Sequence, residues 1–449
     1  MNGVSQNTAD MSGVDLSRIN LNNVKKIEYI PGGGVLYGDK AIGGVINIIT
    51  EDNTSIGYTT GSYGRKDFDV SLSFGNEGWK VFGTYQDNSK DGMRDNSDYN
   101  KETYSIGTQI ALGEYAELKY NLRSTEGKYN FPGSLKKNQL NDISQSLSGK
   151  GSTDYTQKDS NIELAVTYGT LQWITGLNVA DKETNYNYGY FKSESKTDKT
   201  DLTTKFVVDT ENTTIVTGVD YAKTGQDIKG KGIDKEQVGA YYNQKLKYKN
   251  LDFVGGYREE KVNYNYFDKE KKEYNQKLGQ IGLVLNFDKI RLFANQEAGY
   301  RTPTTDEIYN SYMDTYSDLK PQSVTMNDLG IELTPFKGQL IKVTYFDSET
   351  ENELFYNPDT WSNENMKDKT NRSGMTYYIK NTIGPITFAN TYSTLDAKID
   401  GKRIPWTAKE KFNSKLSLDN KGFGASVTYN YTGDKASIVT GKQIGRAHV

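Results

Sequence analysis

The sequence predicts an all-β fold, a transmembrane antiparallel β-barrel, from two observations. Segments of the chain alternate apolar and polar side chains, as residues 68–74 do with the run Phe-Asp-Val-Ser-Leu-Ser-Phe. These segments are joined in turn by very short connections and by long polar ones. Barrels in membranes show both features, because every second side chain of a strand of about ten residues faces lipid and because turns on one membrane side are short.

The connections predict about nineteen strands. Short turns are expected at residues 75–78, 113–115, 169–170, 211–212, 249–250, 288–289, 335–338, 383–384 and 420–422. Long polar loops are expected at residues 87–101, 125–158, 181–198, 224–236, 263–273, 299–323, 357–372 and 397–408. Bacterial barrels have even strand numbers, and those of about 22 strands carry a plug in the lumen. We therefore expect the plugged, roughly 22-stranded class, with the chain ending before its last strands.

Composition excludes several other classes of protein. Mean hydropathy is -0.76, and the longest apolar run, near residues 45–49, is far too short for a membrane-spanning helix of about 20 residues. The 34 tyrosines fit the aromatic girdles of a barrel, although tyrosine is also simply a good strand former. A net charge of -3 without any basic run gives no sign of a nucleic-acid partner.

Catalysis is not expected. The chain has no cysteine and one histidine, His448, so thiolate chemistry and imidazole catalysis are excluded within the barrel. No nucleophile, base or metal-ligand constellation stands out. We therefore expect a protein that is not an enzyme and that holds no cofactor and no metal.

Residues 20–50 differ from the strands that follow. Residues 24–30 are predicted to form a strand, residues 31–34 (Pro-Gly-Gly-Gly) a turn, and residues 45–50 an apolar extended segment. A phosphate-binding loop is the alternative for the glycines. It is excluded because there is no Gly-x-Gly-x-x-Gly spacing, no Gly-Lys-Ser/Thr and no following helix pattern.

The stretch "NNVKKIEYIPGGGVLYGDKAIGGVINIIT", ending at Thr50, resembles the end of the plug domain of TonB-dependent outer-membrane receptors. "YRTPTTDEIY" at residues 300–309, "LKPQS" at residues 319–323 and the segment 393–418 are similar to late barrel motifs of that family. One departure is Pro31, where the family often has Arg, so an ion pair of that Arg is in doubt. The plug motif carries the residues Glu28, Gly32, Gly33, Gly34, Tyr37, Gly38, Gly43 and Gly44.

The resemblance implies a division of the chain. Residues 1–50 would be the C-terminal part of a plug, and residues 51–440 a β-barrel truncated before its last strands. Residues 441–449 would be a non-native tail, since Gln443 to Val449 resembles a translated sequencing adaptor. No signal peptide opens the chain, and an exported protein needs one, so we expect the natural start to lie upstream.

The resemblance also implies active uptake of a scarce chelate across the bacterial outer membrane, driven by the partner TonB through an N-terminal motif. A ferric siderophore is the expected ligand. Cobalamin and haem are alternatives, although haem receptors usually offer a histidine near these motifs and this chain has none there. A different class, a passive porin or an adhesin, is disfavoured by the segment that precedes the barrel.

Candidate ligand-binding residues lie in the predicted loop 299–323 and combine aromatic and cationic groups that suit an anionic chelate. They are Tyr300, Arg301, Tyr309, Tyr312 and Tyr316. The alternative is that these residues form the aromatic rim of the barrel, with Arg301 pairing with a carboxylate such as Glu307. The acidic loop with Asp87, Asp91, Asp95 and Asp98 could bind Ca²⁺, but its spacing is not that of a calcium-binding loop, which favours a solvated loop.

Overall fold

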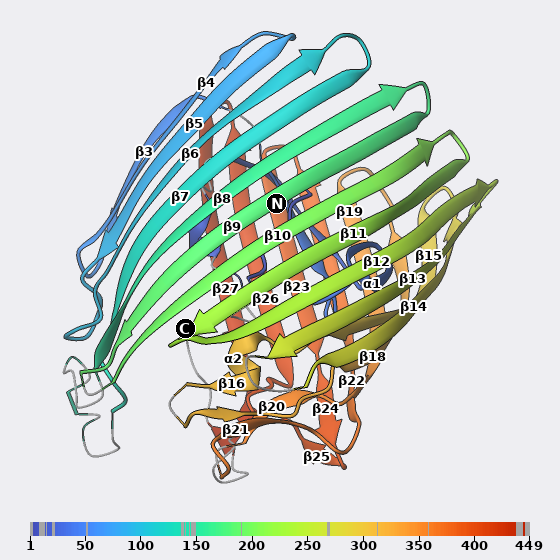
Figure 1. Ribbon diagram of the computed structural model, residues 1–449. Coiled ribbons are helices and arrows are strands. Elements are labelled where there is room, and N and C mark those ends of the chain that lie inside the picture. The colour runs from blue at the N-terminus through green and yellow to red at the C-terminus, as the bar shows by residue number, and fades with distance from the viewer. Residues whose placement is uncertain are drawn as a thin grey trace.

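The computed structural model describes residues 3–8, 14, 16–19, 23–50, 53–135, 139, 141–142, 144, 150–189, 191–266, 270–311, 313–357, 359–436 and 443–444. It shows one large antiparallel barrel with an N-terminal segment inside it (Figure 1). The predicted fold class is confirmed. No helix among the described residues is long and apolar enough to cross a membrane.

Nineteen long strands follow one another around the barrel in the described part of the chain, which is the number that the sequence predicts. They are β3 (Ser55–Gly61), β4 (Arg65–Gly75), β5 (Trp79–Lys90), β6 (Tyr99–Leu112), β7 (Ala116–Phe131), β8 (Gly151–Tyr168), β9 (Leu171–Asn187), β10 (Lys192–Asp209), β11 (Thr213–Ile228), β12 (Lys231–Tyr248), β13 (Leu251–Tyr266), β14 (Lys272–Asn286), β15 (Ile290–Arg301), β18 (Gln322–Leu333), β19 (Gln339–Glu351), β22 (Thr370–Ile383), β23 (Ile386–Thr394), β26 (Glu410–Asn420) and β27 (Phe423–Thr432). A short hairpin, β24 (Asp396–Ile399) and β25 (Lys402–Arg403), extends the sheet between β23 and β26.

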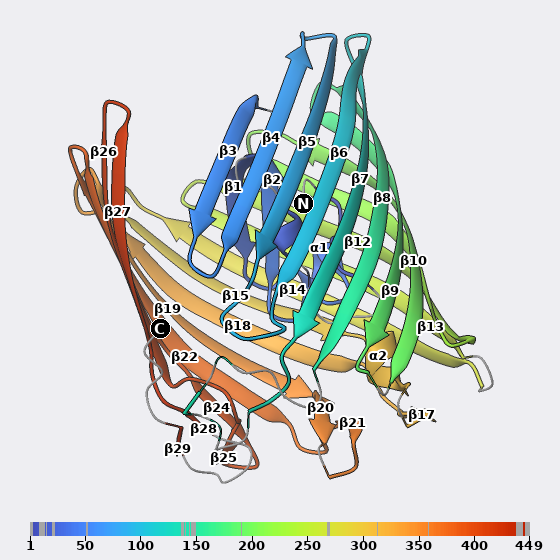
Figure 2. The same ribbon diagram turned by 90° about the vertical axis from the view of Figure 1, so that its left-hand side faces the viewer.

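The seam of the barrel lies between its first and last long strands. The strand order closes the barrel by placing β27 next to β3, and a residue-by-residue register is defined for the other pairs of long neighbours, from β3 with β4 to β26 with β27. Figure 2 shows β27 and β3 diverging toward the upper rim. Both strands are correspondingly exposed along most of their length.

All nine short turns are confirmed to within a residue or two, but three of the predicted long loops are wrong. Residues 181–198 and 224–236 are mostly strand, and strands β13 and β14 occupy residues 263–266 and 272–273 of the third loop, because β9 to β14 continue beyond the length that a bilayer requires. Two of these strands, β10 and β12, have 18 residues, whereas a tilted strand crosses a bilayer in about 9 to 11. Outside lipid both faces can be polar, so the alternation ends while the backbone ladder continues.

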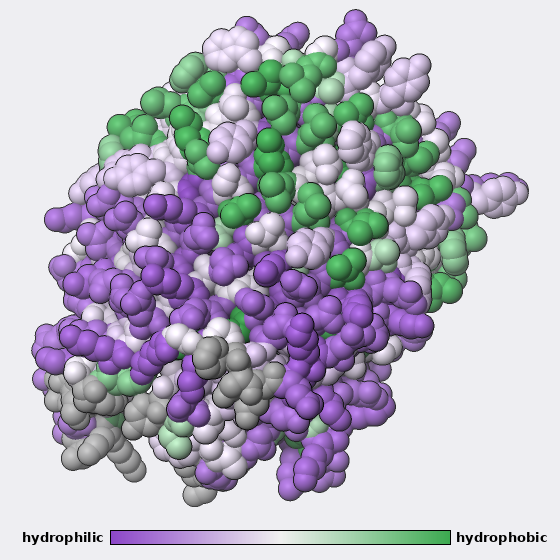
Figure 3. Space-filling view, in the orientation of Figure 1, coloured by the Kyte–Doolittle hydropathy of each residue, from purple (hydrophilic) through white to green (hydrophobic). Residues whose placement is uncertain are grey.

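The outer surface of the barrel divides into an apolar and a polar half. In Figure 3 hydrophobic residues gather over the upper part of the strands, near the short turns, and hydrophilic residues cover the lower, loop-bearing half. The alternation has the predicted parity at the end of the chain, where Leu416 pairs with Val427 and both are exposed on the outer face. The bilayer therefore belongs at the half of the barrel with short turns.

The N-terminal segment inside the barrel, residues 16–50, is called the luminal segment below. It contains the 3₁₀ helix η1 (Leu16–Arg18), strand β1 (Val24–Ile30), helix α1 (Gly34–Tyr37) and strand β2 (Val45–Thr50), with β1 and β2 paired as a two-stranded sheet apart from the barrel. The sequence predicts both strands, and Glu28 on β1 bonds Lys26 and Asn47. It does not predict α1, whose single turn is too short to give a periodic pattern.

Buried contacts hold the luminal segment to the barrel wall at several places, two of which involve a charged residue of the wall at α1 and at η1. Glu297 on β15 accepts the backbone N–H groups of Gly33 at 2.8 Å and Val35 at 3.3 Å, at the start of α1. At the other side of the lumen Arg18 pairs with Asp159 on β8. The glycines of the motif permit this close approach, since a Cβ on Gly32 would lie 2.2 Å from Oε2 of Glu297.

The remaining motif residues have local roles. Gly38 has a φ of +66° and packs on the guanidinium of Arg258. Tyr37 is largely exposed in the lumen, and Gly44, with a φ of +116°, lies against the ring of Tyr29. The hydroxyl of Tyr29 donates to the Gly43 carbonyl at 2.9 Å.

Gly34→Ala is expected to unseat α1, whereas Gly43→Ala is expected to be tolerated. A Cβ on Gly34 would lie 2.3 Å from the carbonyl oxygen of Ala298, which belongs to the rigid ladder of β15, and a Cβ on Gly43 meets nothing within 4 Å. Overpacking of this kind costs about 1–3 kcal/mol. Hydrogen exchange of the amides of residues 33–45 measures the effect, and equal exchange in the two variants would contradict the proposed docking.

Candidate functional site

Tyr300 is the most deeply buried of the predicted ligand-binding residues. Its exposed fraction is 0%, and it packs with Val35 of α1, Tyr264 of β13 and Leu278 of β14 in the main apolar cluster of the protein. In this arrangement the side chain offers no surface to a ligand. It instead packs the luminal segment against the barrel wall.

Arg301 is engaged in a two-fold contact with a carboxylate. Its guanidinium donates to both oxygens of Glu307, at 2.8 and 3.0 Å, and Glu307 also accepts the backbone N–H of Thr304 at 2.8 Å. Glu307 belongs to the short helix α2 (Thr305–Ile308). The pair therefore fixes α2 on the end of β15, which is the structural alternative that the sequence left open for Arg301.

Tyr309 and Tyr316 face each other across a small hairpin of the same loop. Tyr309 lies in β16 (Tyr309–Asn310) and Tyr316 in β17 (Thr315–Tyr316), and their ring centroids are 4.9 Å apart. Tyr309 is buried, and its hydroxyl donates to Asp314 at 2.9 Å. Tyr316 also contacts the ring of Tyr266 edge-on. Tyr312 lies outside the described residues.

A second loop, residues 352–369, docks on the first. It contains the hairpin of β20 (Leu354–Asn357) and β21 (Ser362–Asn365). Asn365 joins the two loops, because its side chain accepts the backbone N–H of Lys320 at 2.7 Å and donates to the Lys320 carbonyl at 3.0 Å. Asn363 donates to the carbonyl of Glu307 at 3.1 Å, which ties the second loop to α2.

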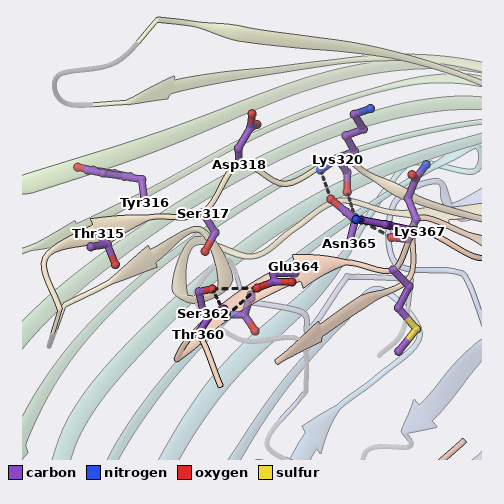
Figure 4. A pocket seen from close by; sticks show the side chains of 13 residues that line it. Thr315, Tyr316, Ser317, Asp318, Lys320, Thr360, Ser362, Glu364, Asn365 and Lys367 are labelled. Carbon is purple, nitrogen blue, oxygen red and sulfur yellow. Dashed lines mark hydrogen bonds between the residues drawn. The ribbon is translucent and has the colours of Figure 1, made fainter. Parts of the chain in front are cut away.

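The two loops line an open cavity of about 770 Å³ at the loop-bearing end of the barrel (Figure 4). Its lining is mostly hydroxyl, amide and charged side chains. The residues are Thr315, Tyr316, Ser317, Asp318, Lys320, Asn352, Thr360, Ser362, Asn363, Glu364, Asn365, Met366 and Lys367. Of the four predicted ligand-binding residues that the structure describes, Tyr316 alone lines this cavity, which is called the outer pocket below.

The outer pocket is lined by two cations, Lys320 and Lys367, and by two carboxylates, Asp318 and Glu364. Asp318 is neutralised by a close contact with Lys272, and Glu364 accepts hydrogen bonds from Thr360 at 2.6 Å and from Asn357 at 3.0 Å. These bonds, that of Thr360 foremost, lower the pKa of Glu364.

Lys320 and Lys367 form none of the ion pairs defined among the described residues, and their ammonium groups project to the same side in Figure 4. The sequence places Lys320 in the "LKPQS" motif, but no local pattern singles out Lys367, because only folding brings the loops together.

Metal binding by these side chains finds no support in the structure. The described residues contain no group of three or more His, Asp or Glu side chains placed to hold a metal ion, and this includes the described part of the acidic loop with Asp87, Asp91, Asp95 and Asp98. Asp98 instead bonds Asn130 at 2.8 and 2.9 Å. Burial and the bond to Asp314 raise the pKa of Tyr309 to about 12.

Comparisons with known proteins agree with this architecture. The family model "TonB dependent receptor-like, beta-barrel" matches residues 44–443. The vitamin B12 transporter BtuB of Vibrio vulnificus is 23% identical over 97% of this chain and 72% of its own length.

Solved structures show the same fold. The ferric yersiniabactin uptake receptor FyuA of Yersinia pestis is similar with a TM-score of 0.78 at 15% identity, over 95% of this chain and 76% of that one. The copper transporter OprC is similar with a TM-score of 0.79 at 13% identity, over 98% of this chain and 77% of that one. Because the family model covers most of the chain, this protein belongs to the TonB-dependent receptors, non-enzymatic receptors and transporters of the bacterial outer membrane.

Proposed function

We propose that the protein takes up an anionic metal chelate, of which a ferric siderophore is the expected example, by binding it first at the outer pocket. The observation that carries the proposal is the presence of two ammonium groups, Lys320 and Lys367, in a polar cavity of about 770 Å³. Cavities of about 300–1,000 Å³ accommodate ligands of this size. Ammonium groups form charge-assisted hydrogen bonds with carboxylate, catecholate or hydroxamate oxygens.

The role of each predicted residue changes accordingly. Tyr316 remains a proposed ligand contact, because it lines the outer pocket. We propose that Tyr300, Arg301 and Tyr309 support the loop from below, since they are packed or paired within it. Residues 1–50 are proposed to be the C-terminal part of a plug and residues 51–440 the barrel, with TonB as the energy-supplying partner of the plug.

Cobalamin is the second candidate ligand, and two observations favour it. The lining contains many amide and hydroxyl groups, such as Asn352, Asn363 and Ser362, that can bond the peripheral amides of a corrinoid. The similarity to the vitamin B12 transporter extends over 97% of the chain. Haem is less well supported, because the described loops present no histidine.

Replacing both lysines, Lys320→Met and Lys367→Met, is expected to weaken binding of an anionic ferric tris-catecholate by about 1–3 kcal/mol for each lost charge-assisted bond. Methionine retains the length and packing of the side chain while removing the charge. Fluorescence titration of the protein in detergent micelles, with the ferric tris-catecholate, a neutral ferric trihydroxamate and cyanocobalamin, compares the three classes of ligand.

The matched control is Lys289→Met, which removes the same charge in a short turn at the opposite end of the barrel. It should leave every affinity unchanged. Tight binding of cyanocobalamin alone, insensitive to the lysine variants, would replace the siderophore by cobalamin. Arg301→Ala should lower the yield of folded protein, whereas the titrations should show little change in ligand affinity. A selective loss of affinity would return Arg301 to the ligand site.

A further inference from the structure

Asp39 of the luminal segment forms a closed triangle with two residues of the barrel. Its Oδ1 accepts the backbone N–H of Thr302 at 2.8 Å, and its Oδ2 accepts the Thr302 hydroxyl at 2.6 Å. Lys235 of β12 donates its ammonium group to the same Oδ2 at 2.5 Å and to Oγ1 of Thr302 at 2.7 Å. Thr302 follows the last residue of β15, so the triangle joins the luminal segment, the barrel wall and the base of loop 302–321.

The three side chains are buried, and the charges of Asp39 and Lys235 are opposite. The side chains of Asp39 and Lys235 are 6% and 10% exposed, and Thr302 is fully buried. Burial alone would raise the pKa of Asp39, but the attraction of Lys235 and Lys40 and the hydrogen bonds lower it below the ordinary value. Asp39 is therefore an anion at neutral pH. Breaking such a buried pair on one side is strongly unfavourable, because the other charge stays behind without a partner.

Two neighbouring contacts reinforce the same junction. The backbone N–H of Lys40 donates to the carbonyl of Tyr300 at 3.1 Å, so two consecutive residues of the luminal segment hold the end of β15. From the wall, the hydroxyl of Tyr264 donates to the carbonyl of Pro303 at 2.8 Å. The base of the loop is thus fixed by residues that lie far from it in sequence.

A continuous set of contacts leads from this junction to the outer pocket. Arg301 precedes Thr302 in the chain, and its ion pair with Glu307 fixes α2. The carbonyl of Glu307 in turn accepts Asn363 of the second loop. Beyond α2 the chain forms the Tyr309–Tyr316 hairpin and then one wall of the pocket, residues 315–320. Both loops of the pocket therefore rest on the segment that Asp39 holds.

We propose that Asp39 is a positioning residue for the outer pocket: with the luminal segment seated, its bonds to Thr302 and Lys235 hold loop 302–321 in the pocket-forming conformation. Seating of the luminal segment and formation of the pocket are then one coupled equilibrium. By linkage, a movement of the luminal segment loosens the pocket, and a ligand that orders the loop holds the luminal segment in place. This inference rests on the proposed function at one point, the binding of the ligand in the outer pocket.

Asp39→Ala is expected to raise the exchange rates of the amides of residues 304–320 on the order of tenfold, as follows from losing buried charge-assisted hydrogen bonds at a local opening. The measurement is hydrogen–deuterium exchange of the full chain in detergent micelles, without ligand. Amides in the middle of β8 and β9 should exchange as in the unmodified protein. The matched control is Asp234→Ala, which removes an exposed aspartate beside Lys235 on the opposite face of β12.

Two further variants separate loop release from general destabilisation. The double variant Asp39→Ala with Lys235→Met removes both charges and leaves neither one buried alone. Thr302→Val keeps the Asp39–Lys235 pair and removes only the hydroxyl. Both should speed exchange in residues 304–320. Unchanged exchange in that region, or an equal increase throughout the barrel, would overturn the proposal.

The two proposals fail in different ways. If no ferric chelate binds while loop exchange still depends on Asp39, the proposed cargo is wrong and the coupling stands. If chelates bind through Lys320 and Lys367 while loop exchange ignores Asp39, the coupling is wrong and the cargo stands.

Discussion

Arg258→Met should lower the free energy of unfolding by about 3–5 kcal/mol, the usual loss when one partner of a buried ion pair is removed. The Arg258 side chain is 2% exposed inside the barrel and bonds Asp220 at 2.9 Å and Glu260 at 2.5 Å. Without the guanidinium, the buried carboxylate of Glu260 loses its cationic partner and keeps the hydrogen bond from the side-chain amide of Gln237 at 2.7 Å. Urea titration in lipid vesicles, followed by tryptophan fluorescence, measures the loss.

The control for this variant is Arg291→Met, since Arg291 is half exposed on β15 and lies 3.7 Å from Glu332. Exposed pairs of this kind are worth about 0–1 kcal/mol. A similar small loss for both variants would show that water reaches Arg258 and that the lumen around Gly38 is not closed. The luminal segment should also loosen in Arg258→Met, because Gly38 packs on that guanidinium.

Val427→Arg is expected to destabilise the barrel by about 2–4 kcal/mol, the penalty for a cation on the lipid-facing surface at mid-membrane. Val427 is 72% exposed, lies in β27 and pairs with Leu416 on the outer face. Its neighbour Ser426 pairs with Ser417 on the inner face. The same titration in vesicles, together with heat-dependent migration on gels, reports the loss.

Ser426→Arg is the matched control, because it adds the same side chain one residue away on the opposite face. Ser426→Arg should lower the free energy of unfolding clearly less than Val427→Arg does, since the new cation would face the polar lumen and not lipid. Equal losses would mean that the facing of β27 is shifted by one residue. Recovery of the unmodified protein as a detergent-free soluble monomer would contradict the membrane assignment as a whole.

The strands and their facing could be predicted from the sequence because both depend on neighbouring residues. Alternation over residues 68–74 and turns such as residues 169–170 are local signals, and the nine short turns fall where they are expected. The alternation of apolar and polar residues no longer identified strands where the barrel leaves the lipid. Residues 181–198 and 224–236 lost their alternation outside lipid and suggested loops, although the hydrogen-bonded ladder continues there.

The candidate site could be predicted only in part. The motif at residues 300–309 marked a loop that contributes to the outer pocket, but a single sequence cannot show whether a tyrosine or an arginine is already engaged by neighbouring residues. The Tyr300 ring is buried in the apolar cluster, and the Arg301 guanidinium is paired with the carboxylate of Glu307. The cations that line the outer pocket, Lys320 and Lys367, come from two loops that meet through Asn365.

The sequence by itself therefore determined the barrel, the number and facing of its long strands, and the presence of a distinct segment before it, because period, turn length and glycine spacing are encoded locally. Only the tertiary structure decided which charges are neutralised. Asp39, Lys235 and Thr302 are separated by 196 and 67 residues along the chain, yet they share two hydrogen-bonded oxygens. These three residues meet only when the barrel folds around the luminal segment. Contacts between residues so far apart in the chain leave no pattern in the sequence.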